Sequence, residues 1–351
     1  MTHHDLALIG FGGVNRALAE IIRDRGSDLA DDLGFTLRVV AITDLRFGSL
    51  MQADGIDLAA VLAMTGDATF AGMPGGDADP RNDHVIRTTT AGIIVEATYT
   101  NPIDGEPAIS HVRAALESGK SVTTTNKGPV ALASTELNRL AEANGVRFEY
   151  EGSVMSGTPV LRLAQQTLQG LRITRIQGIL NGTSNFVLGQ MESGKSLEDA
   201  VAEAQALGYA EADPTADIEG SDVQLKVVIL ANELLGAEIT TADVSRVGIS
   251  GITASDVIAA AAAGEHWKLL GTISRDESGA VTASVEPLSL AADHPLAGIS
   301  GATNAIAFTT DLLGTVTMSG PGAGRLETAY ALLSDIIAID AQQAALAGAV
   351  R

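Results

Sequence analysis

The stretch from Gly208 to Lys226 contains the densest group of side chains that could do chemistry. It holds five carboxylates and one lysine, and an apolar run follows it directly. Asp217 suits a helix N-cap because its side chain can accept from free amides, and we expect a helix over residues 218–235. On that helix Asp222 and Lys226, four residues apart, share one face. By itself this pattern is typical of a surface ion pair on an acidic helix.

Composition excludes several kinds of site. The 351 residues include no cysteine, so disulfides, thiolate metal ligands and thiol nucleophiles are absent. The six histidines are scattered without metal-ligand spacing, and no tyrosine has a lysine four residues later, as a short-chain reductase would need. An enzyme that transfers a hydride between a cofactor and a carbonyl compound needs a proton donor or acceptor beside the carbonyl oxygen. Lysine is the remaining candidate, because its ammonium can hold a developing alkoxide.

Charge and hydropathy indicate the surroundings in which the protein works. The 43 acidic residues against 22 basic ones give a formal net charge of −21, which leaves no basic surface for nucleic acid. This acidic, lysine-poor composition is typical of proteins from salt-loving organisms; an ordinary acidic protein is the alternative. No apolar run approaches the roughly 20 residues of a membrane span. The N-terminus does not resemble a signal peptide, so we expect a cytoplasmic protein without membrane partners.

Residues 6–22 have the pattern of a dinucleotide-binding strand, glycine turn and helix. Gly10 permits the tight turn, and Gly12 lets the backbone approach a pyrophosphate. Asn15 replaces the third glycine of the motif, which weakens it. The next strand ends at Asp44, an acid suited to NAD, but Arg46 could accommodate the NADP phosphate. The preference between NAD and NADP therefore stays open.

The rest of the chain is expected to form an α/β protein in three parts. Residues 1–145 would be a Rossmann-type dinucleotide-binding domain, 146–315 an α/β catalytic domain, and 316–351 a segment returning to the first domain. Within the first part, residues 48–83 look loosely organised, and two strands end at Thr98 and at Lys127, where ligands bind in such sheets. Residues 181–185 are expected to cap a helix with exposed amides, as a seat for an anion or a carboxylate.

The carboxylates around Lys226 suggest a substrate that carries an ammonium group. Glu211 and Asp222 could bind it, which points to an amino-acid alcohol or aldehyde. Asp222 and Lys226 are then interpreted as two walls of a substrate pocket rather than as partners of one another.

Five collinear segments resemble the homoserine dehydrogenase family over nearly the whole chain. They are Thr124-Thr-Asn-Lys127, Glu151-Gly-Ser-Val-Met-Ser-Gly-Thr-Pro159, Gly178-Ile-Leu-Asn-Gly-Thr-Ser-Asn185, Gly208-Tyr-Ala-Glu-Ala-Asp-Pro214 with its following Asp217, Asp222 and Lys226, and Gly320-Pro-Gly-Ala-Gly324.

The resemblance implies a role for each matching residue. Lys226 would be the acid/base lysine with Asp217 as its orienting carboxylate, and Lys127 would reach the substrate and the nicotinamide. Glu211 and Asp222 would hold the substrate's amino group. Gly10, Gly12, Val14, Thr98 and Gly322 would meet the dinucleotide. A monovalent cation, Na+ or K+, would bind at Glu151, Val154, Ser156 and Thr158, although the family often has small residues where Met155 and Ser156 stand.

The implied reaction converts L-homoserine and NAD(P)+ to L-aspartate 4-semialdehyde and NAD(P)H, at the branch to threonine and methionine. The resemblance also implies a homodimer formed through the second domain. Because the sequence ends at Arg351, we expect neither a C-terminal ACT domain nor an aspartate kinase, and no threonine inhibition through such a domain. The alternatives are another NAD(P)-dependent oxidoreductase of amino or oxo acids, or a non-catalytic dinucleotide sensor.

Overall fold

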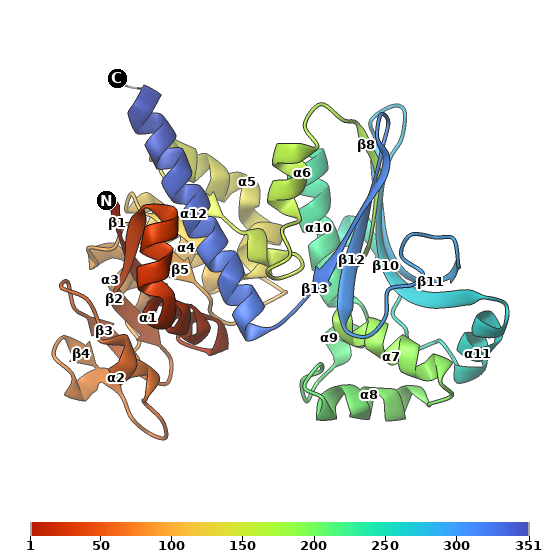
Figure 1. Cartoon of the computed structure of the whole chain (residues 1–351), viewed down its shortest axis with the longest axis horizontal. Helices are drawn as coiled ribbons and strands as arrows, with labels where there is room; N and C mark the ends of the chain where they lie inside the picture. Colours follow the sequence, from red (N-terminus) through yellow and green to blue (C-terminus); the bar gives the residue numbers. More distant parts are fainter. Residues whose placement is uncertain (1, 350–351) are drawn as a thin grey trace. The chain divides into compact units, whose positions relative to one another are not determined.

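The computed structural model describes residues 2–349, which form two compact units. The first contains the N-terminal part to Ser153 together with the C-terminal part from Gly324, and the second is Val154–Ala323. The expected boundaries were 145/146 and 315/316. The chain crosses between units a few residues later in each case, at 153/154 and 323/324. The two units are described separately below (Figure 1).

The described residues of the first unit build a sheet of seven strands in the order β4-β3-β2-β1-β5-β6-β7. Its elements are β1 (Thr2–Ile9), α1 (Gly13–Leu33), β2 (Phe35–Asp44), β3 (Gly48–Met51), α2 (Leu58–Leu62), η1 (Phe70–Gly72), β4 (Gly76–Asp77), α3 (Asn82–Thr88), β5 (Ile93–Glu96), α4 (Ala108–Glu117), β6 (Ser121–Thr124), α5 (Lys127–Ala143), β7 (Phe148–Glu149), η2 (Glu151–Ser153) and α12 (Arg325–Ala349).

The strand order creates a ligand-binding edge beside β1. β1 pairs in parallel with β2 on one side and with β5 on the other. After β1 the chain adds strands on one side of it, and from β5 onward it adds them on the other side, so the order of strands reverses at β1. In open α/β sheets, ligands bind at such a switch point, outside the carboxyl ends of the strands. The α/β fold with a Rossmann-type domain is therefore confirmed. The expectation of a loose excursion over 48–83 is wrong, because β3 and β4 extend the sheet as antiparallel strands.

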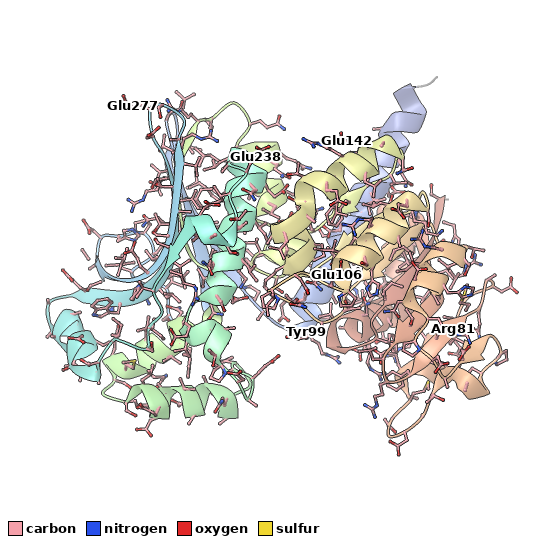
Figure 2. All side chains as sticks on the ribbon, turned by 180° about the vertical axis from the view of Figure 1, so that it is seen from behind. Arg81, Tyr99, Glu106, Glu142, Glu238 and Glu277 are labelled. Carbon is pink, nitrogen blue, oxygen red and sulfur yellow. The ribbon has the colours of Figure 1, made fainter. Side chains whose placement is uncertain are left out.

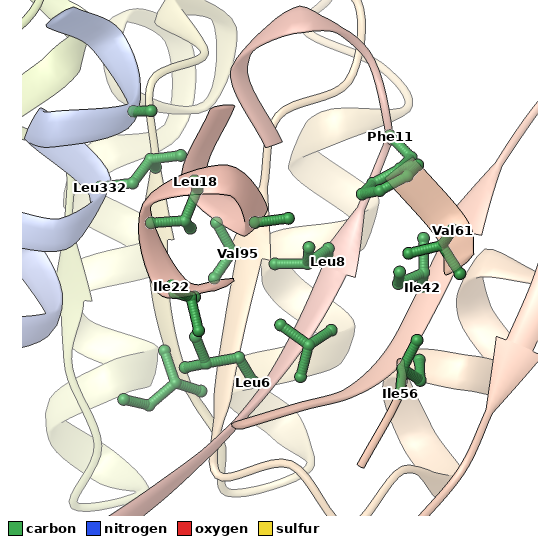
Figure 3. Packing of buried hydrophobic residues seen from close by; sticks show 14 of the residues in the cluster. Leu6, Leu8, Phe11, Leu18, Ile22, Ile42, Ile56, Val61, Val95 and Leu332 are labelled. Atoms are coloured by element: carbon green, nitrogen blue, oxygen red, sulfur yellow. The ribbon is translucent and has the colours of Figure 1, made fainter. Parts of the chain in front are cut away.

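The core of the first unit is completed by the C-terminal helix. Leu6, Leu8 and Ile42 of the strands pack with Leu18 of α1, and Leu332 of α12 joins the same buried cluster (Figure 3). α12 packs along α1 although some 300 residues separate them. The long apolar stripe of α12 is thus buried on the first unit, as helix amphipathicity requires.

The second unit is built on a sheet of six strands within the described residues, in the order β13-β12-β8-β10-β11-β9. α7 and α10 pack against this sheet. Its elements are α6 (Leu161–Thr167), β8 (Ile173–Ile179), α7 (Gly182–Glu192), α8 (Leu197–Ala206), α9 (Thr215–Ile218), α10 (Ser221–Leu235), η3 (Thr241–Asp243), β9 (Val244–Arg246), α11 (Ala254–Ala262), β10 (Glu265–Arg275), β11 (Val281–Ala291), β12 (Thr303–Thr310) and β13 (Gly314–Pro321). The return segment expected from residue 316 is therefore still sheet until Pro321.

The excess acidic side chains lie on the surface of both units. Glu142, Glu238 and Glu277 are exposed and point outward (Figure 2). Between residues 2 and 349, no helix is both long and apolar enough to cross a membrane.

Candidate active site

The glycine turn after β1 has the geometry that dinucleotide binding needs. Gly10 has φ +82°, and a Cβ there would lie 2.7 Å from the Ala97 carbonyl oxygen. Gly12 precedes the first residue of α1, is exposed, and has nothing within 4 Å of the position of a Cβ. The amide end of α1 therefore stays open for a pyrophosphate. Val14 and Thr98, the other expected cofactor contacts of this unit, are half-buried.

Asn15 has a task of its own where the motif has its third glycine. The side chain is fully buried, and its Nδ2 donates to the carbonyl oxygens of Gly10 at 2.7 Å, Ile9 at 3.3 Å and Val95 at 3.3 Å. It therefore joins the ends of β1 and β5 beneath the turn. Asn15, which stands where the motif has its third glycine, therefore fixes the same turn by hydrogen bonds.

Asp44 and Arg46 are held in different environments at the end of β2. Asp44 Oδ2 accepts from the Phe11 amide of the glycine turn at 2.8 Å, and its Oδ1 accepts from the Arg46 amide at 2.8 Å. The Arg46 guanidinium donates to the Gly66 carbonyl and lies over the Phe47 ring, 5.2 Å from its centroid. The acid is thus part of the turn, while the arginine is engaged by a neighbouring loop.

The end of β6 places Lys127 at the same edge of the sheet. Asn126 caps α5 by accepting from the Gly128 amide at 3.1 Å, and its Nδ2 donates to the Tyr99 carbonyl at 3.1 Å. Lys127 follows as the first residue of α5 and is half-buried. Gly10, Thr98 and Lys127 therefore lie at the carboxyl ends of the adjacent strands β1, β5 and β6.

Lys226 is the centre of a buried polar cluster in the second unit. Only 6% of it is exposed, and its Nζ donates to Asp222 Oδ2 and to the Leu180 carbonyl, both at 2.6 Å. Asn181 Nδ2 bridges two carboxylates, donating to Asp217 Oδ1 at 2.6 Å and to Asp222 Oδ2 at 3.0 Å. Its Oδ1 caps α7 by accepting from the Ser184 amide at 2.9 Å.

Three expectations about this cluster are wrong. The helix begins at Ser221, because Gly220 has a left-handed φ of +75° that separates α9 from α10. Asp217 therefore lies in the short helix α9 and is not an N-cap. Asp222 and Lys226 are direct partners rather than separate walls of a pocket, and Asp217 is linked to Asp222 through Asn181.

The surroundings of Asp217 disfavour its charged form. Burial raises the pKa of this carboxyl, and the neighbouring Asp222 charge raises it further. Hydrogen bonds from Asn181 and Thr183 and the charge of Lys226 act in the opposite direction. The cluster thus holds two carboxylates in unequal environments beside one lysine.

Other expected contacts of this unit lie apart from the cluster. Glu211 is exposed, and among the described residues no hydrogen bond links its side chain to Lys226 or Asp222. At the expected anion or carboxylate seat at 181–185, four of the five residues are buried and Asn181 binds the protein's own carboxylates. Gly322 packs on the buried Asn304, whose amide nitrogen lies 2.0 Å from the position of a Cβ at Gly322.

The expected cation loop falls on the division between the units. Glu151 belongs to the first unit, and its amide donates to Asp335 Oδ1 at 3.4 Å. Val154, Ser156 and Thr158 belong to the second unit and are buried. Met155 and Ser156 have left-handed φ values of +58° and +53°, uncommon for residues other than glycine. Residues 2–349 contain no group of three or more His, Cys, Asp or Glu side chains suited to a metal.

Sequence reasoning did not identify Asn126 as a cap, and within the capping turn expected at 181–185 it did not identify Asn181 as the residue that acts. Each precedes the first residue of a helix at the end of a strand, and each caps that helix while its amide nitrogen binds a neighbouring segment. An asparagine directly after an apolar strand and before a glycine or lysine is a readable N-cap signal. Its second function depends on segments distant in sequence and could not be read from spacing.

Comparison with known proteins agrees with both units. The family model described as homoserine dehydrogenase matches residues 159–337, and the model of the homoserine dehydrogenase NAD-binding domain matches residues 10–151. The NAD(+)-dependent homoserine dehydrogenase of Pseudomonas canavaninivorans is 59% identical over 340 residues, 97% of each chain. The homoserine dehydrogenase of Methanocaldococcus jannaschii is 39% identical, over 95% of this chain and 98% of its own.

Solved structures agree as well. A putative homoserine dehydrogenase from Archaeoglobus fulgidus has a TM-score of 0.85 at 35% identity, covering 97% of this chain and 99% of its own. A hyperthermophilic archaeal homoserine dehydrogenase in complex with NADPH has a TM-score of 0.82 at 30% identity, covering 97% and 98%. The chain therefore belongs to the homoserine dehydrogenase family.

Proposed function

We propose that this protein interconverts L-homoserine and L-aspartate 4-semialdehyde with NAD+ and NADH, at the branch to threonine and methionine. The observation that carries the proposal is the buried Asp222–Lys226 pair bridged by Asn181, within a chain that matches the family along its length. A buried lysine with a carboxylate at 2.6 Å can hold and exchange a proton at one position.

The first unit fits a dinucleotide. The open Cβ position of Gly12 leaves room for a pyrophosphate at the start of α1, and the Asp44 carboxylate beside it can still accept from ribose hydroxyls. When bound, the nicotinamide supplies or accepts the hydride. Gly10, Val14 and Thr98 of this unit, and Gly322 of the second, are the proposed contacts.

Lys226 is proposed as the acid/base group. In reduction its Nζ gives a proton to the aldehyde oxygen as that oxygen becomes a hydroxyl, and in oxidation it takes the proton back. Asp222 fixes the Nζ by direct contact, and Asp217 acts through Asn181. Lys127 contacts the substrate and nicotinamide, and Glu211 with Asp222 binds the substrate's ammonium group.

NAD is proposed as the preferred dinucleotide. Asp44 is half-buried and anchored to the glycine turn, where its charge disfavours a ribose phosphate. Arg46, which could have bound that phosphate, is engaged by Gly66 and Phe47. The relative from Pseudomonas canavaninivorans is named NAD(+)-dependent. The measurement is kcat/KM for NAD+ and NADP+ with homoserine, and a preference for NADP+ would contradict the proposal.

A monovalent cation is proposed at a site built largely of backbone carbonyls, at Glu151, Val154, Ser156 and Thr158. The support is the pair of left-handed residues Met155 and Ser156, because strained backbone of this kind persists where a site needs it. Homodimer formation and activity in molar salt are also proposed, the latter from the formal charge of −21. Potassium, sodium and salt titrations of activity, with the mass in solution, test these points.

The central experiment is NADH oxidation with aspartate semialdehyde, at low and at molar salt. Lys226→Met should lower kcat by about 10²-fold or more, the typical share of acid–base catalysis, while NADH still binds. Turnover by Lys226→Met close to that of wild type would remove Lys226 from its role. Another oxo-acid substrate preferred over the semialdehyde would favour the alternative oxidoreductase, and NADH binding without turnover of any substrate would favour the sensor.

A further inference from the structure

We propose that Glu96 is a positioning residue, which fixes the two strand ends that carry Thr98 and Lys127. This inference rests on the proposed function, because it concerns the same nucleotide-binding edge. Glu96 is the last residue of β5 and is fully buried. Burying a carboxylate is costly unless hydrogen bonds compensate for lost water, so its partners show what the position is for.

One carboxylate oxygen holds the segment that follows β5. Glu96 Oε1 accepts from the Thr98 amide at 3.0 Å and also from the Thr98 hydroxyl. This segment forms a wall of the glycine turn, because Gly10 packs against Ala97 and Thr98. A shift of Thr98 would therefore change the room that Gly10 leaves for a dinucleotide.

The other carboxylate oxygen holds the end of β6. Glu96 Oε2 accepts from the Thr124 hydroxyl at 2.7 Å, and the same hydroxyl oxygen accepts from the Asn126 amide at 3.0 Å. Asn126 closes the connection by donating to the carbonyls of Thr98 and Tyr99. The position of Lys127, the next residue, thus depends on a ring of hydrogen bonds that passes through Glu96.

The buried side chains of His111 and Thr43 and the half-buried side chain of Asn82 form a line behind Glu96. His111 Nδ1 lies 3.8 Å from Glu96 Oε1, and His111 Nε2 lies 3.0 Å from Asn82 Nδ2. Thr43 Oγ1, on the strand that ends at Asp44, donates to Asn82 Oδ1 at 2.6 Å. Because Asn82 Nδ2 can only donate, the imidazole proton belongs on Nδ1, facing the carboxylate.

The geometry requires a carboxylate and not an amide. Thr98 donates twice to one oxygen and Thr124 donates to the other, so both oxygens must accept. Glutamine has the same shape but presents an NH2 group on one side. Glu96→Gln therefore leaves the proton of the buried Thr124 hydroxyl without its acceptor, which weakens the hold on the end of β6, while the volume of the core stays filled.

The test compares two neighbouring threonines. Thr123 and Thr124 are both fully buried, and each donates to a buried carboxylate at 2.7 Å: Thr123 to Asp335 and Thr124 to Glu96. Thr124→Val and Glu96→Gln should lower kcat by about 10²-fold, the loss expected for a misplacement of about 1 Å. They should also weaken NADH binding, measured by NADH fluorescence. Thr123→Val should lower the thermal midpoint by about as much as Thr124→Val does, but it should leave kcat within about twofold of wild type.

Rescue separates positioning from mere stability. Thr124→Ser keeps the hydroxyl and should restore kcat and NADH affinity close to wild type, which supports the proposal. Equal kcat losses in Thr124→Val and Thr123→Val, or unchanged NADH affinity and kcat in Glu96→Gln, would overturn it. If Glu96→Gln does not fold, the Thr124 pair decides alone. NADH affinity remains measurable if homoserine is not the substrate, so the failure of the proposed function is distinguishable from the failure of this one.

Discussion

Asn181→Ser would separate the two tasks of the asparagine that bridges Asp217 and Asp222. Serine keeps an N-cap oxygen for α7, since serine and asparagine are comparable caps, but it cannot bridge both carboxylates. The lost contacts are two hydrogen bonds to carboxylates, at 2.6 and 3.0 Å. Each is worth about 1.5–3 kcal/mol.

The expected loss follows from these contacts. Because the two bonds share one donor nitrogen and their energies do not simply add, we expect Asn181→Ser to lose about 3 kcal/mol of unfolding free energy. Asn181→Ala also loses the cap, so it should lose about 1 kcal/mol more. Asp222 would keep Lys226 but lose its second partner, and we expect kcat to fall by about tenfold or more.

Trp267 allows the unfolding of the second unit to be followed by itself. It is the sole tryptophan, and it lies on β10 of the second unit, so its fluorescence in urea reports unfolding of the unit that contains the cluster. Asn232→Ser is the matched control, because the Asn232 side chain also makes two hydrogen bonds, at 2.8 and 2.9 Å, but to the Ile239 backbone. It should lose stability without losing kcat. Asn181→Ser with wild-type stability and wild-type kcat would refute the bridging role.

Three further predictions concern four positions. Gly10→Ala should lose about 1–2 kcal/mol or more from its left-handed φ and its contact with Ala97, whereas Gly12→Ala should melt like wild type but bind NADH more weakly; equal melting of both would contradict the assignment. Because the pKa of Asp217 is raised, its ionisation destabilises the fold above that pKa. Asp217→Asn should therefore melt above wild type at pH 8, and the difference should vanish as pH falls below the ordinary value of 3.8. Gly322→Ala should lower the thermal midpoint, because its Cβ would lie 2.0 Å from the Asn304 amide nitrogen.

The sequence was sufficient to predict the fold class and the family, because both depend on local patterns. The strand before Gly10, the helix after it and five collinear segments are all visible without coordinates. It was not sufficient to predict which carboxylate meets Lys226. A left-handed Gly220 changes the helix start by three residues, and spacing alone cannot show that a glycine takes this conformation.

The same limit applies to polar residues whose partners are distant in sequence. Asn15 was read as a defect in a glycine motif, yet its side chain reaches Val95 on another strand. Glu96 lies in the strand that was expected to end at Thr98, and its neighbours Thr98, Thr124 and His111 could be identified only once β5, β6 and α4 were placed. Tertiary contacts decide such roles, and local propensity does not predict these contacts.

Because α12 returns to the first unit, the two units can complete their folding in a different order from their order in the sequence. The core beneath β1 includes Leu332, Ile336 and Ile339, which are translated only after the second unit is complete at residue 323. A nascent chain can therefore finish the later unit while the earlier one still exposes part of its core. We therefore expect nucleotide binding to need α12, so nascent chains halted before residue 325 should not retain NADH.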